Sequence, residues 1–564
     1  IRGYSKKSAT QYIGTARDLL TWAGNNTQKY LSWGTEHLWY FLHEDIQYDI
    51  TPVVSTAALT SAFATTGGST KITVSVAGHT RSVGDYLFFT STAAMASGTI
   101  NVVSDTTIYS VLSVVDANKF TITSPVTAGA TETSVGGSGT VHFLLETGIS
   151  VATPGLGFGA GVFNAGASAT GERAWNSPAE TSNITFALTT WSLDNWGEDV
   201  LACRRGSQIF YLDINASVTP ERAVVVTASP AVNNSILVSP NDRHVISFGC
   251  TGFASAFSPL RVRWSDSEDY TNWTPSVSST SGEVDLISGT EIVGAVRSRN
   301  QINILTDQAL YGMTYTGGND IFSFRQLGSN CGLIGPHAAV DYDGTPFWMS
   351  HNNFYMFDGQ VKNLKSTIRR ELFGNFANAQ KDKVYAGVNS EFKEVIWLYP
   401  SASGTECDSY AIYNPEENHW VYGTTKWTTF KDRAVYNNTI TTGSDSYIYD
   451  NEPTGVYTGD SLAIPSYLES ADIDLEEGVD MMFVDKIIPD FTINDGVLQF
   501  TVSTKKYPND SLTVKGPYSI TSSTKKIDLR ARGRQARVRV SSASTGIDWR
   551  WGAVRAAAQK DGQN

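Results

Sequence analysis

The stretch Ile209-Phe210-Tyr211-Leu212-Asp213 decides the fold, because closely similar stretches return along the chain. Apolar and aromatic residues that close on an acid or amide also form Phe354-Tyr355-Met356-Phe357-Asp358, Tyr447-Ile448-Tyr449-Asp450 and, more loosely, Tyr410-Ala411-Ile412-Tyr413-Asn414. Each copy reads as a β-strand too short to bury its own apolar face. Repeated antiparallel units that bury one another by stacking predict a radial β architecture, most simply a β-propeller.

The spacing of the repeats indicates the number of blades. Repeat units are expected at about 190–213, 236–273, 291–328, 338–362, 384–424 and 433–450. Together with the stretch 30–49, they predict an irregular propeller of six or seven blades. Because unrelated sequence separates 30–49 from the other units, we expect it to pair with the last blade and close the ring. Helical spacing within 366–379 predicts a short helix between blades.

The whole chain reads as all-β, with four regions. Residues 1–54 hold the first propeller strands, and residues 55–147, rich in Thr, Ser, Ala, Val and Gly, form a small inserted β-sandwich or barrel. The propeller occupies 148–464. Residues 465–564 change in composition again and predict a separate C-terminal β-sandwich. The chain begins with Ile rather than Met, so we expect some N-terminal residues to be missing.

Composition restricts the possible partners. The chain has 564 residues, of which 41% are hydrophobic and 11% aromatic, enough for large buried cores. A net charge of −13 argues against a surface that grips nucleic acid by neutralising phosphates, although DNA could still pass by without binding. No apolar stretch approaches the roughly 20 residues that span a bilayer, so no membrane span is expected.

Cysteine and histidine usage argues against a metal or cofactor site. Cys203, Cys250, Cys331 and Cys407 lie far apart and form no CxxC pair, so buried free thiols are expected. The eight histidines are scattered and form no HExxH motif. The sequence also contains no nucleophile elbow, paired-carboxylate motif or cofactor fingerprint. We therefore expect no catalytic, cofactor-binding or metal-binding residues, and a protein that is not an enzyme.

One turn is similar to a motif of sialidase-type propellers. The stretch 265–273 (SDSEDYTNW) has the pattern of an Asp-box, in which an aspartate caps a hairpin above a buried tryptophan. We interpret Asp266 as structural, because its carboxylate would accept hydrogen bonds from the local backbone. A sialidase would also need several arginines and a Tyr–Glu pair converging on the axis.

The strongest charge pattern lies near the C-terminal end. Arg530, Arg532 and Arg534 alternate along an expected strand, which would place them on one face. They could dock against an acidic neighbour, such as the acidic strand expected at 472–477 of an adjacent subunit, or they could form a solvated face. The candidate inter-subunit or adaptor-docking residues are Arg530, Arg532, Arg534, Asp472, Asp474, Glu476, Trp549 and Trp551.

Several phrases distributed over nearly the whole chain resemble the tail tube or nozzle protein of short-tailed bacteriophages (podoviruses; tail tubular protein B type). They are 14–22 (GTARDLLTW), 48–52 (YDITP), 191–199 (WSLDNWGED), 328–336 (GSNCGLIGP) and 384–392 (VYAGVNSEF).

This resemblance implies a structural virion protein: a homohexamer that forms the distal tail tube and lets double-stranded DNA pass during ejection without binding it specifically. It further implies that 1–54 and 465–564 contribute to a platform that docks to the portal–adaptor complex, and that other domains meet tail fibres or other tail proteins. The protein would be assembled in the host bacterial cytoplasm and reside in the virion tail. We expect acidic residues to face the lumen, since an acidic wall repels phosphates.

Two alternatives remain open from the sequence. A β-propeller glycosidase of the sialidase type could act on host surface polysaccharide, or a glycan-binding protein could hold sugars against exposed aromatic residues of the insert 55–147 without turnover.

Overall fold

The computed structural model describes residues 3–25, 27–90, 107–152, 187–214, 221–299, 301–318, 320–453, 455–475, 479–494 and 496–562. The chain divides into two compact units, Ser8–Ile448 and a second unit made of Ile1–Lys7 with Tyr449–Asn564. Both consist almost entirely of antiparallel β-sheet. The Gly-rich connector at 155–161 lies outside the described residues.

The unit Ser8–Ile448 is built mainly from consecutive four-stranded sheets, each a blade of a β-propeller. Blade 1 consists of β2 (Ala16–Ala23), β3 (Lys29–Thr35), β4 (Trp39–His43) and β5 (Ile46–Asp49). Blade 2 consists of β15 (Trp191–Trp196), β16 (Asp199–Arg204), β17 (Ile209–Leu212) and β18 (Val224–Val225). Blade 3 consists of β19 (Asn233–Val238), β20 (Val245–Thr251), β21 (Phe257–Trp264) and β22 (Gly282–Asp285).

The remaining blades follow in chain order. Blade 4 consists of β23 (Ile292–Arg297), β24 (Ile302–Thr306), β25 (Ala309–Tyr315) and β26 (Phe322–Ser329). Blade 5 consists of β27 (Ala339–Tyr342), β28 (Thr345–Met349), β29 (Phe354–Phe357) and β30 (Val361–Leu364). Blade 6 consists of β31 (Tyr385–Asn389), β32 (Glu394–Tyr399), β33 (Ser409–Asn414) and β34 (His419–Thr424). Blade 7 starts with β35 (Trp427–Lys431) and β36 (Thr439–Gly443), after which the chain enters β37 (Ile448–Asn451), where the boundary between the units falls.

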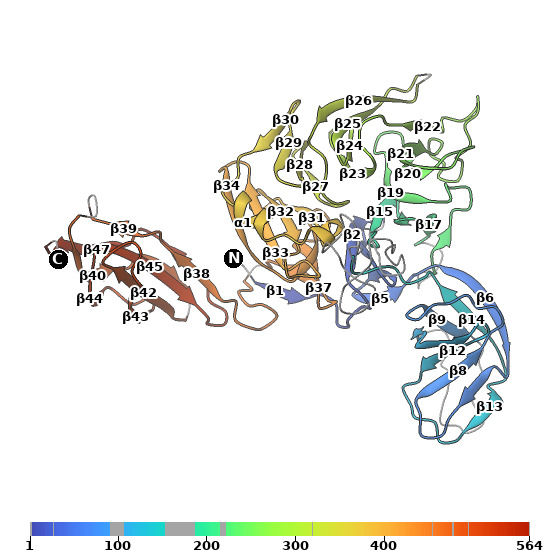
Figure 1. Cartoon of the computed structure of the whole chain (residues 1–564), viewed down its shortest axis with the longest axis horizontal. Helices are drawn as coiled ribbons and strands as arrows, with labels where there is room; N and C mark the ends of the chain where they lie inside the picture. Colours follow the sequence, from blue (N-terminus) through green and yellow to red (C-terminus); the bar gives the residue numbers. More distant parts are fainter. Residues whose placement is uncertain are drawn as a thin grey trace, which may run out of the picture. The chain divides into compact units, whose positions relative to one another are not determined.

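The propeller therefore has seven blades among the described residues, and its ring is closed. The first strand of each blade is innermost, and β2 packs beside both β15 and β35 (Figure 1). The expectation that 30–49 pairs with the last blade is wrong, because these residues form the three outer strands of blade 1. At the axis the ring is closed by β2 (16–23) beside β35, and Leu31 and Trp33 of that stretch pack in one core with Ile440 of blade 7.

The four repeated phrases all occupy the same place, the third strand of a blade. They form β17, β29, β33 and β37. In β17, Ile209, Phe210 and Leu212 are all buried, although their side chains point to both faces of the sheet. A third strand is covered by neighbouring blades on both faces, so apolar and aromatic residues are favoured at successive positions.

Aromatic side chains form much of the contact between blades. Phe354 of blade 5 packs against Trp397 and Trp420 of blade 6, with ring centroids 4.7 Å away in each case. Phe354 and Trp397 are fully buried, and each contributes roughly 2 kcal/mol through removal of apolar surface from water, whereas Trp420 is half-buried. The four cysteines are buried in these cores and unpaired, as their spacing predicts.

The inserted small β-domain follows blade 1 and has a core of its own around Phe63, Phe89 and Phe120. Its two sheets have the orders β10-β9-β14-β6 and β11-β12-β8-β7-β13. The strands are β6 (Val53–Thr60), β7 (Phe63–Thr65), β8 (Lys71–Ser75), β9 (Tyr86–Thr90), β10 (Tyr109–Ser110), β11 (Ser113–Asp116), β12 (Lys119–Thr123), β13 (Glu132–Val135) and β14 (Ser138–Leu144).

The second unit contains the C-terminal β-sandwich and a short antiparallel pair of β1 (Tyr4–Lys6) with β37. The sandwich sheets have the orders β38-β45-β42-β43, with β39 beside β45, and β44-β40-β47, and β41 pairs with β46. The strands are β38 (Ser466–Glu469), β39 (Ile473–Asp474), β40 (Met482–Ile488), β41 (Phe491–Ile493), β42 (Leu498–Lys505), β43 (Thr513–Ile520), β44 (Ile527–Gly533), β45 (Gln535–Ser542), β46 (Trp549–Trp551) and β47 (Arg555–Lys560).

In the described residues, helical structure begins within the stretch 366–379, where a short helix was expected, and continues to Lys383. The α-helix α1 (Arg369–Gly374) and the 3₁₀ segment η2 (Asn378–Lys383) lie between blades 5 and 6. Within the part of the chain that the structure describes, no helix has the length and apolar character needed to cross a membrane.

The contact between blades 1 and 2 is tight enough to test by one added methyl group. A Cβ atom at Gly34 would lie 2.3 Å from the indole of Trp191, whose Nε1 donates a hydrogen bond to the Thr35 carbonyl at 2.7 Å. We expect Gly34→Ala to lower the free energy of unfolding by about 1–3 kcal/mol, measured by urea denaturation. Gly374→Ala is the control, because no atom lies within 4 Å of its added Cβ. Equal stability of the two variants would contradict this packing.

Candidate functional site

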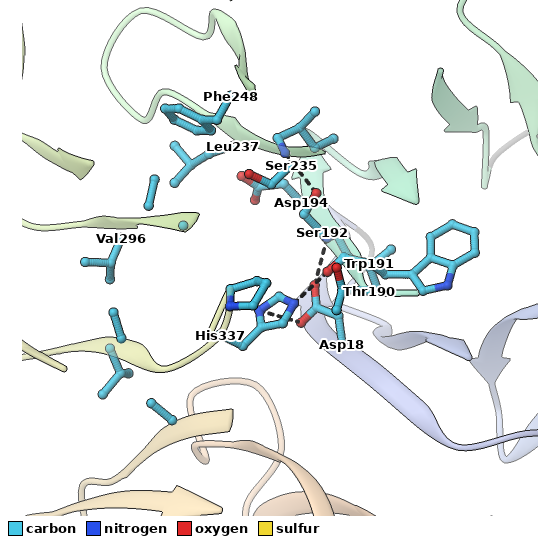
Figure 2. Close-up of a pocket in the computed structure, with 18 of the residues that line it drawn as sticks. Asp18, Thr190, Trp191, Ser192, Asp194, Ser235, Leu237, Phe248, Val296 and His337 are labelled. Carbon is cyan, nitrogen blue, oxygen red and sulfur yellow. Dashed lines mark hydrogen bonds and ion pairs between the residues drawn. The ribbon is translucent and has the colours of Figure 1, made fainter. Parts of the chain in front are cut away.

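A cavity of about 360 Å³ lies where the innermost strands of the seven blades converge, and is called the axial cavity (Figure 2). Phe248, Leu237 and Val296 form an apolar part of its wall, while Asp18, Asp194 and His337 lie on the polar part (Figure 2). The titratable residues that line it are Asp18, Asp194, Arg297, His337, Asp341, Tyr385 and Lys431.

The Asp18 carboxylate joins three blades. Its Oδ2 accepts a hydrogen bond from the Leu193 amide of blade 2 at 2.8 Å, and its Oδ1 accepts one from the Tyr385 hydroxyl of blade 6 at 3.1 Å. The Leu19 amide also donates to Oδ1, at 2.8 Å. Burial, together with the neighbouring Asp18 charge, raises the pKa of Tyr385 well above its usual value. Tyr385 therefore stays a neutral donor to Asp18.

Asp194 has the same role one blade further on. Its Oδ2 accepts a hydrogen bond from the Val238 amide of blade 3 at 2.6 Å and forms an ion pair with Arg297 of blade 4. Its Oδ1 accepts a hydrogen bond from the Asn195 amide at 3.0 Å. Arg297 Nε donates to the Val238 carbonyl at 2.9 Å. Blades 2, 3 and 4 are thus held together through one carboxylate.

His337 completes this network from the chain segment just before blade 5. Its Nε2 lies 2.6 Å from the Trp191 carbonyl oxygen, so Nε2 carries a proton and donates it. Its Nδ1 lies 4.0 Å from Asp18 Oδ1, and its ring stacks on Tyr385 with centroids 5.2 Å apart. The imidazole therefore positions blade 5 against blades 2 and 6.

Two side chains that line the axial cavity, Lys431 and Asp341, have polar atoms that bond to no other blade among the described residues. Lys431, the last residue of β35, has an ammonium group with no hydrogen-bond or ion-pair partner among the described residues. Burial lowers the pKa of Lys431; Asp18 acts to raise it and Arg297 to lower it. Asp341 Oδ2 accepts the Gly344 amide at 2.9 Å, whereas its Oδ1 is buried without a partner.

The described lining residues do not assemble a sialidase-type constellation, which needs several arginines and a Tyr–Glu pair. They include one arginine, Arg297, and no glutamate, and the Tyr385 hydroxyl is bonded to Asp18. Nor does any group of three or more His, Cys, Asp or Glu side chains in the described ranges have an arrangement suited to a metal ion. These side chains hold the blades together, and the groups left without a hydrogen-bond partner among the described residues include those of Lys431 and Asp341.

The Asp-box turn in blade 3 has the geometry expected of a structural turn. Asp266 Oδ1 accepts hydrogen bonds from the Thr280 amide (2.8 Å), the Thr280 hydroxyl (2.6 Å) and the Ser267 amide (3.0 Å). Trp273 is buried beneath the turn. Burial acts to raise the pKa of Asp266, but these hydrogen bonds outweigh it and the pKa lies below its usual value.

A buried ion cluster, which the sequence reasoning missed, links blades 1 and 6. Both terminal nitrogens of Arg17 donate to the Glu406 carboxylate, at 2.6 and 2.8 Å, and Lys383 Nζ lies 2.7 Å from the same carboxylate. Burial acts to raise the pKa of Glu406, and the two cations lower it below its usual value. The only sequence signal was a charged Arg17-Asp18 pair inside an apolar strand.

The structure places two of the three candidate docking arginines on one strand face. Arg530 and Arg532 lie on the exposed face of β44. Arg534 was expected on the same strand, but it lies in the turn between β44 and β45, where it donates to the Val479 carbonyl. Arg532 pairs with Asp561 at 2.5 Å.

The acidic candidates contact other residues of the same unit. Asp472 lies 2.7 Å from Lys505 Nζ and 3.1 Å from Arg537 Nε, and the hydrogen bond from Lys505 lowers its pKa. Asp474 accepts a 3.4 Å hydrogen bond from Gln535. The acidic strand expected at 472–477 is shorter in the described part, consisting of Ile473–Asp474, and Glu476 lies outside the described residues.

Trp549 and Trp551 lie on β46, half-buried against the sandwich core. Trp549 Nε1 donates to Ser466 Oγ at 3.1 Å, and the Trp551 ring lies 5.5 Å from that of Phe491. Both therefore have a packing role and also an exposed portion, as is common at interfaces.

No protein-family model matches the chain, and no curated protein matches it. Among solved structures, the phage phi92 endosialidase is 11% identical, with 71% of this chain and 64% of that chain covered and a TM-score of 0.18. Apo AztD from Citrobacter koseri is 10% identical (70% and 94% covered, TM-score 0.26), and the exo-β-1,3-galactanase from Phanerochaete chrysosporium is 9% identical (67% and 98% covered, TM-score 0.22). Similarities at this level support no inference about function.

The network around the axial cavity predicts a large effect of a nearly isosteric change. Asp194→Asn removes the charge that pairs with Arg297 and weakens the acceptor for the Val238 amide. We expect a loss of about 2–3 kcal/mol in the free energy of unfolding, measured by chemical denaturation. Asp343→Asn, which breaks an exposed ion pair with Arg299, is the matched control and should change stability by less than about 0.5 kcal/mol. An unchanged free energy of unfolding in Asp194→Asn would contradict the role of Asp194 in holding the blades together.

The cluster of Arg17, Lys383 and Glu406 predicts an acid-dependent loss of stability. Because the folded-state pKa of Glu406 is depressed, its contribution is present above the unfolded-state value of 4.5 and is lost as the pH falls through the lower folded-state value. The free energy of unfolding of Glu406→Gln should therefore fall less steeply below pH 4.5 than that of the unmodified protein. Glu417→Gln, at an exposed position, should retain the unmodified slope; identical slopes for all three proteins would refute the prediction.

Proposed function

We propose that this chain is a structural virion protein that forms the hexameric distal tail tube, or nozzle, of a short-tailed bacteriophage. The sequence phrases at 14–22, 48–52, 191–199, 328–336 and 384–392 supply the family resemblance. The observation that carries the proposal is the surface of the C-terminal sandwich, which has the composition of a docking interface.

Large apolar side chains are exposed on this small domain. Tyr467 and Tyr507 have 63% and 58% of their surface exposed, and Leu468, Leu512 and Val514 are also exposed. Aromatic residues together with arginine are enriched at protein–protein interfaces. Arg530 adds an exposed cation on β44.

Acidic and basic residues are concentrated in different parts of the sandwich sequence. Residues 465–495 contain nine Asp or Glu and one Lys, whereas residues 505–560 contain 13 Lys or Arg and three Asp. A closed ring of identical subunits joins two different surfaces of each subunit, and opposite charges favour that pairing. Some of these charges are already paired within the unit, as Asp472 is, so the available cations are those such as Arg530.

Passage of DNA would use the space enclosed by several subunits. The axial cavity of one propeller, about 360 Å³, has the size of a small-molecule site and is too small for a duplex. A net charge of −13 on each subunit keeps phosphates from adhering to the wall. In this proposal the sandwich meets the portal–adaptor complex, and other surfaces meet tail fibres or other tail proteins.

Assembly provides the test. We expect the full chain to form six-fold rings, seen by electron microscopy and by mass measurement in solution. Arg530→Glu reverses an exposed charge on β44 and should weaken ring formation by about tenfold or more, as loss of a charged interfacial contact does.

Arg299→Glu is the matched control, because Arg299 is an exposed arginine on the propeller, and it should leave the ring intact. A chain that stays monomeric at every concentration would overturn the proposal. A monomer that hydrolyses a sialoside would favour the propeller glycosidase alternative.

A further inference from the structure

We propose that the axial cavity binds a small hydroxylated carboxylic acid of the size of an acidic monosaccharide, with its carboxylate toward Lys431 and Arg297 and its hydroxyl groups toward Asp341. This binding activity is separate from ring assembly and does not depend on it.

Lys431 supplies the first reason. Its ammonium group lines the cavity at the inner end of blade 7 and has no hydrogen-bond or ion-pair partner among the described residues. Lys431 is half-buried, and a cation partly removed from water without a partner is costly; an anionic ligand would offset that cost. Burial lowers the pKa of Lys431, which agrees with an environment that lacks a counter-charge in contact with it.

The neighbouring carboxylates cannot easily turn toward Lys431. Both oxygens of Asp18 and both oxygens of Asp194 accept hydrogen bonds from backbone amides of the inner strands. Arg297 uses Nε and one terminal nitrogen for Val238 and Asp194, and its other terminal nitrogen has no partner among the described residues. Uncommitted N–H donors therefore come from two cations that line the same cavity, one in blade 4 and one in blade 7.

Asp341 supplies a complementary acceptor. Its Oδ1 is buried without a hydrogen-bond partner, and an unsatisfied buried acceptor is costly. A hydroxyl group of the ligand would satisfy this oxygen. The cavity thus offers both free donors and a free acceptor.

Asp341 and Lys431 line the same cavity. They also line a second hollow of about 420 Å³, which shares Val340 and Ala386 with the axial cavity as well. Ala386 and Gly387 of β31 carry small side chains or none, which leaves room beside Asp341 and Lys431.

The charges of the site select the ligand class. Asp18, Asp194 and Asp341 face Arg297 and Lys431, and His337 is committed through Nε2 to the Trp191 carbonyl. A neutral sugar would leave Lys431 without a counter-charge, and inorganic phosphate would place an additional negative charge near Asp341 without donating hydrogen bonds from several hydroxyls. A hydroxylated carboxylate satisfies both kinds of free group.

Calorimetric titration of the full chain with glucuronate tests the proposal, with glucose and inorganic phosphate as comparison probes. We expect glucuronate to bind and both comparison probes to bind at least about tenfold more weakly. Lys431→Met retains an unbranched side chain one atom shorter but removes the charge, and should weaken glucuronate binding about tenfold or more. Lys362→Met, at an exposed lysine paired with Asp358 on the rim of blade 5, should bind as the unmodified chain does.

Asp341→Asn separates the two parts of the proposed site. It should weaken glucuronate binding, because a neutral amide is a poorer acceptor for the ligand hydroxyls. Tighter binding in this variant would contradict the position assigned to those hydroxyls. Absence of glucuronate binding, equal binding of glucose or phosphate, or binding that persists in Lys431→Met would each overturn the proposal, whether or not the chain forms rings.

Discussion

The structure depends on how the innermost strand of each blade satisfies its free edge. An inner strand has backbone amides facing the axis that no further strand can bond, and buried unpaired amides are costly. Asp18 of blade 1 accepts the Leu193 amide of blade 2, and Asp194 of blade 2 accepts the Val238 amide of blade 3. Ser192 Oγ accepts the Ile236 amide in the same way. Side chains of one blade thus complete the backbone bonding of the next.

This arrangement explains why the side chains around the axis are polar and yet few of them are free to bind a ligand. The Asp18 and Asp194 carboxylates, which could otherwise act on a ligand, are held by amides and by Tyr385 or Arg297. Lys431 and the unpartnered oxygen of Asp341 remain. The cavity can therefore bind a ligand through these two residues and through the free terminal nitrogen of Arg297.

Aromatic residues have two roles in the chain. The propeller buries large aromatic residues such as Trp348 and Trp397 between blades, and both units also expose some, such as Tyr422 on the propeller and Tyr467 and Tyr507 on the C-terminal sandwich. Buried aromatic residues stabilise the fold, whereas aromatic residues together with arginine at the surface are enriched at interfaces. On the sandwich the exposed aromatic residues occur with exposed arginine and separated charge, which is the reason to look for the function of the chain there.

Local pattern in the sequence determined the all-β class, the repeated third strand of the blades and the short helix near α1, because strand and helix periodicity depend only on neighbouring residues. Tertiary structure alone decided that blade 1 is complete, that Arg534 turns away from Arg530 and Arg532, and that Asp18 binds Leu193 and Tyr385. Those last two partners lie 175 and 367 residues away in the chain. Their convergence follows from closing the ring, which places all seven inner strands at one axis, and no local periodicity records that closure.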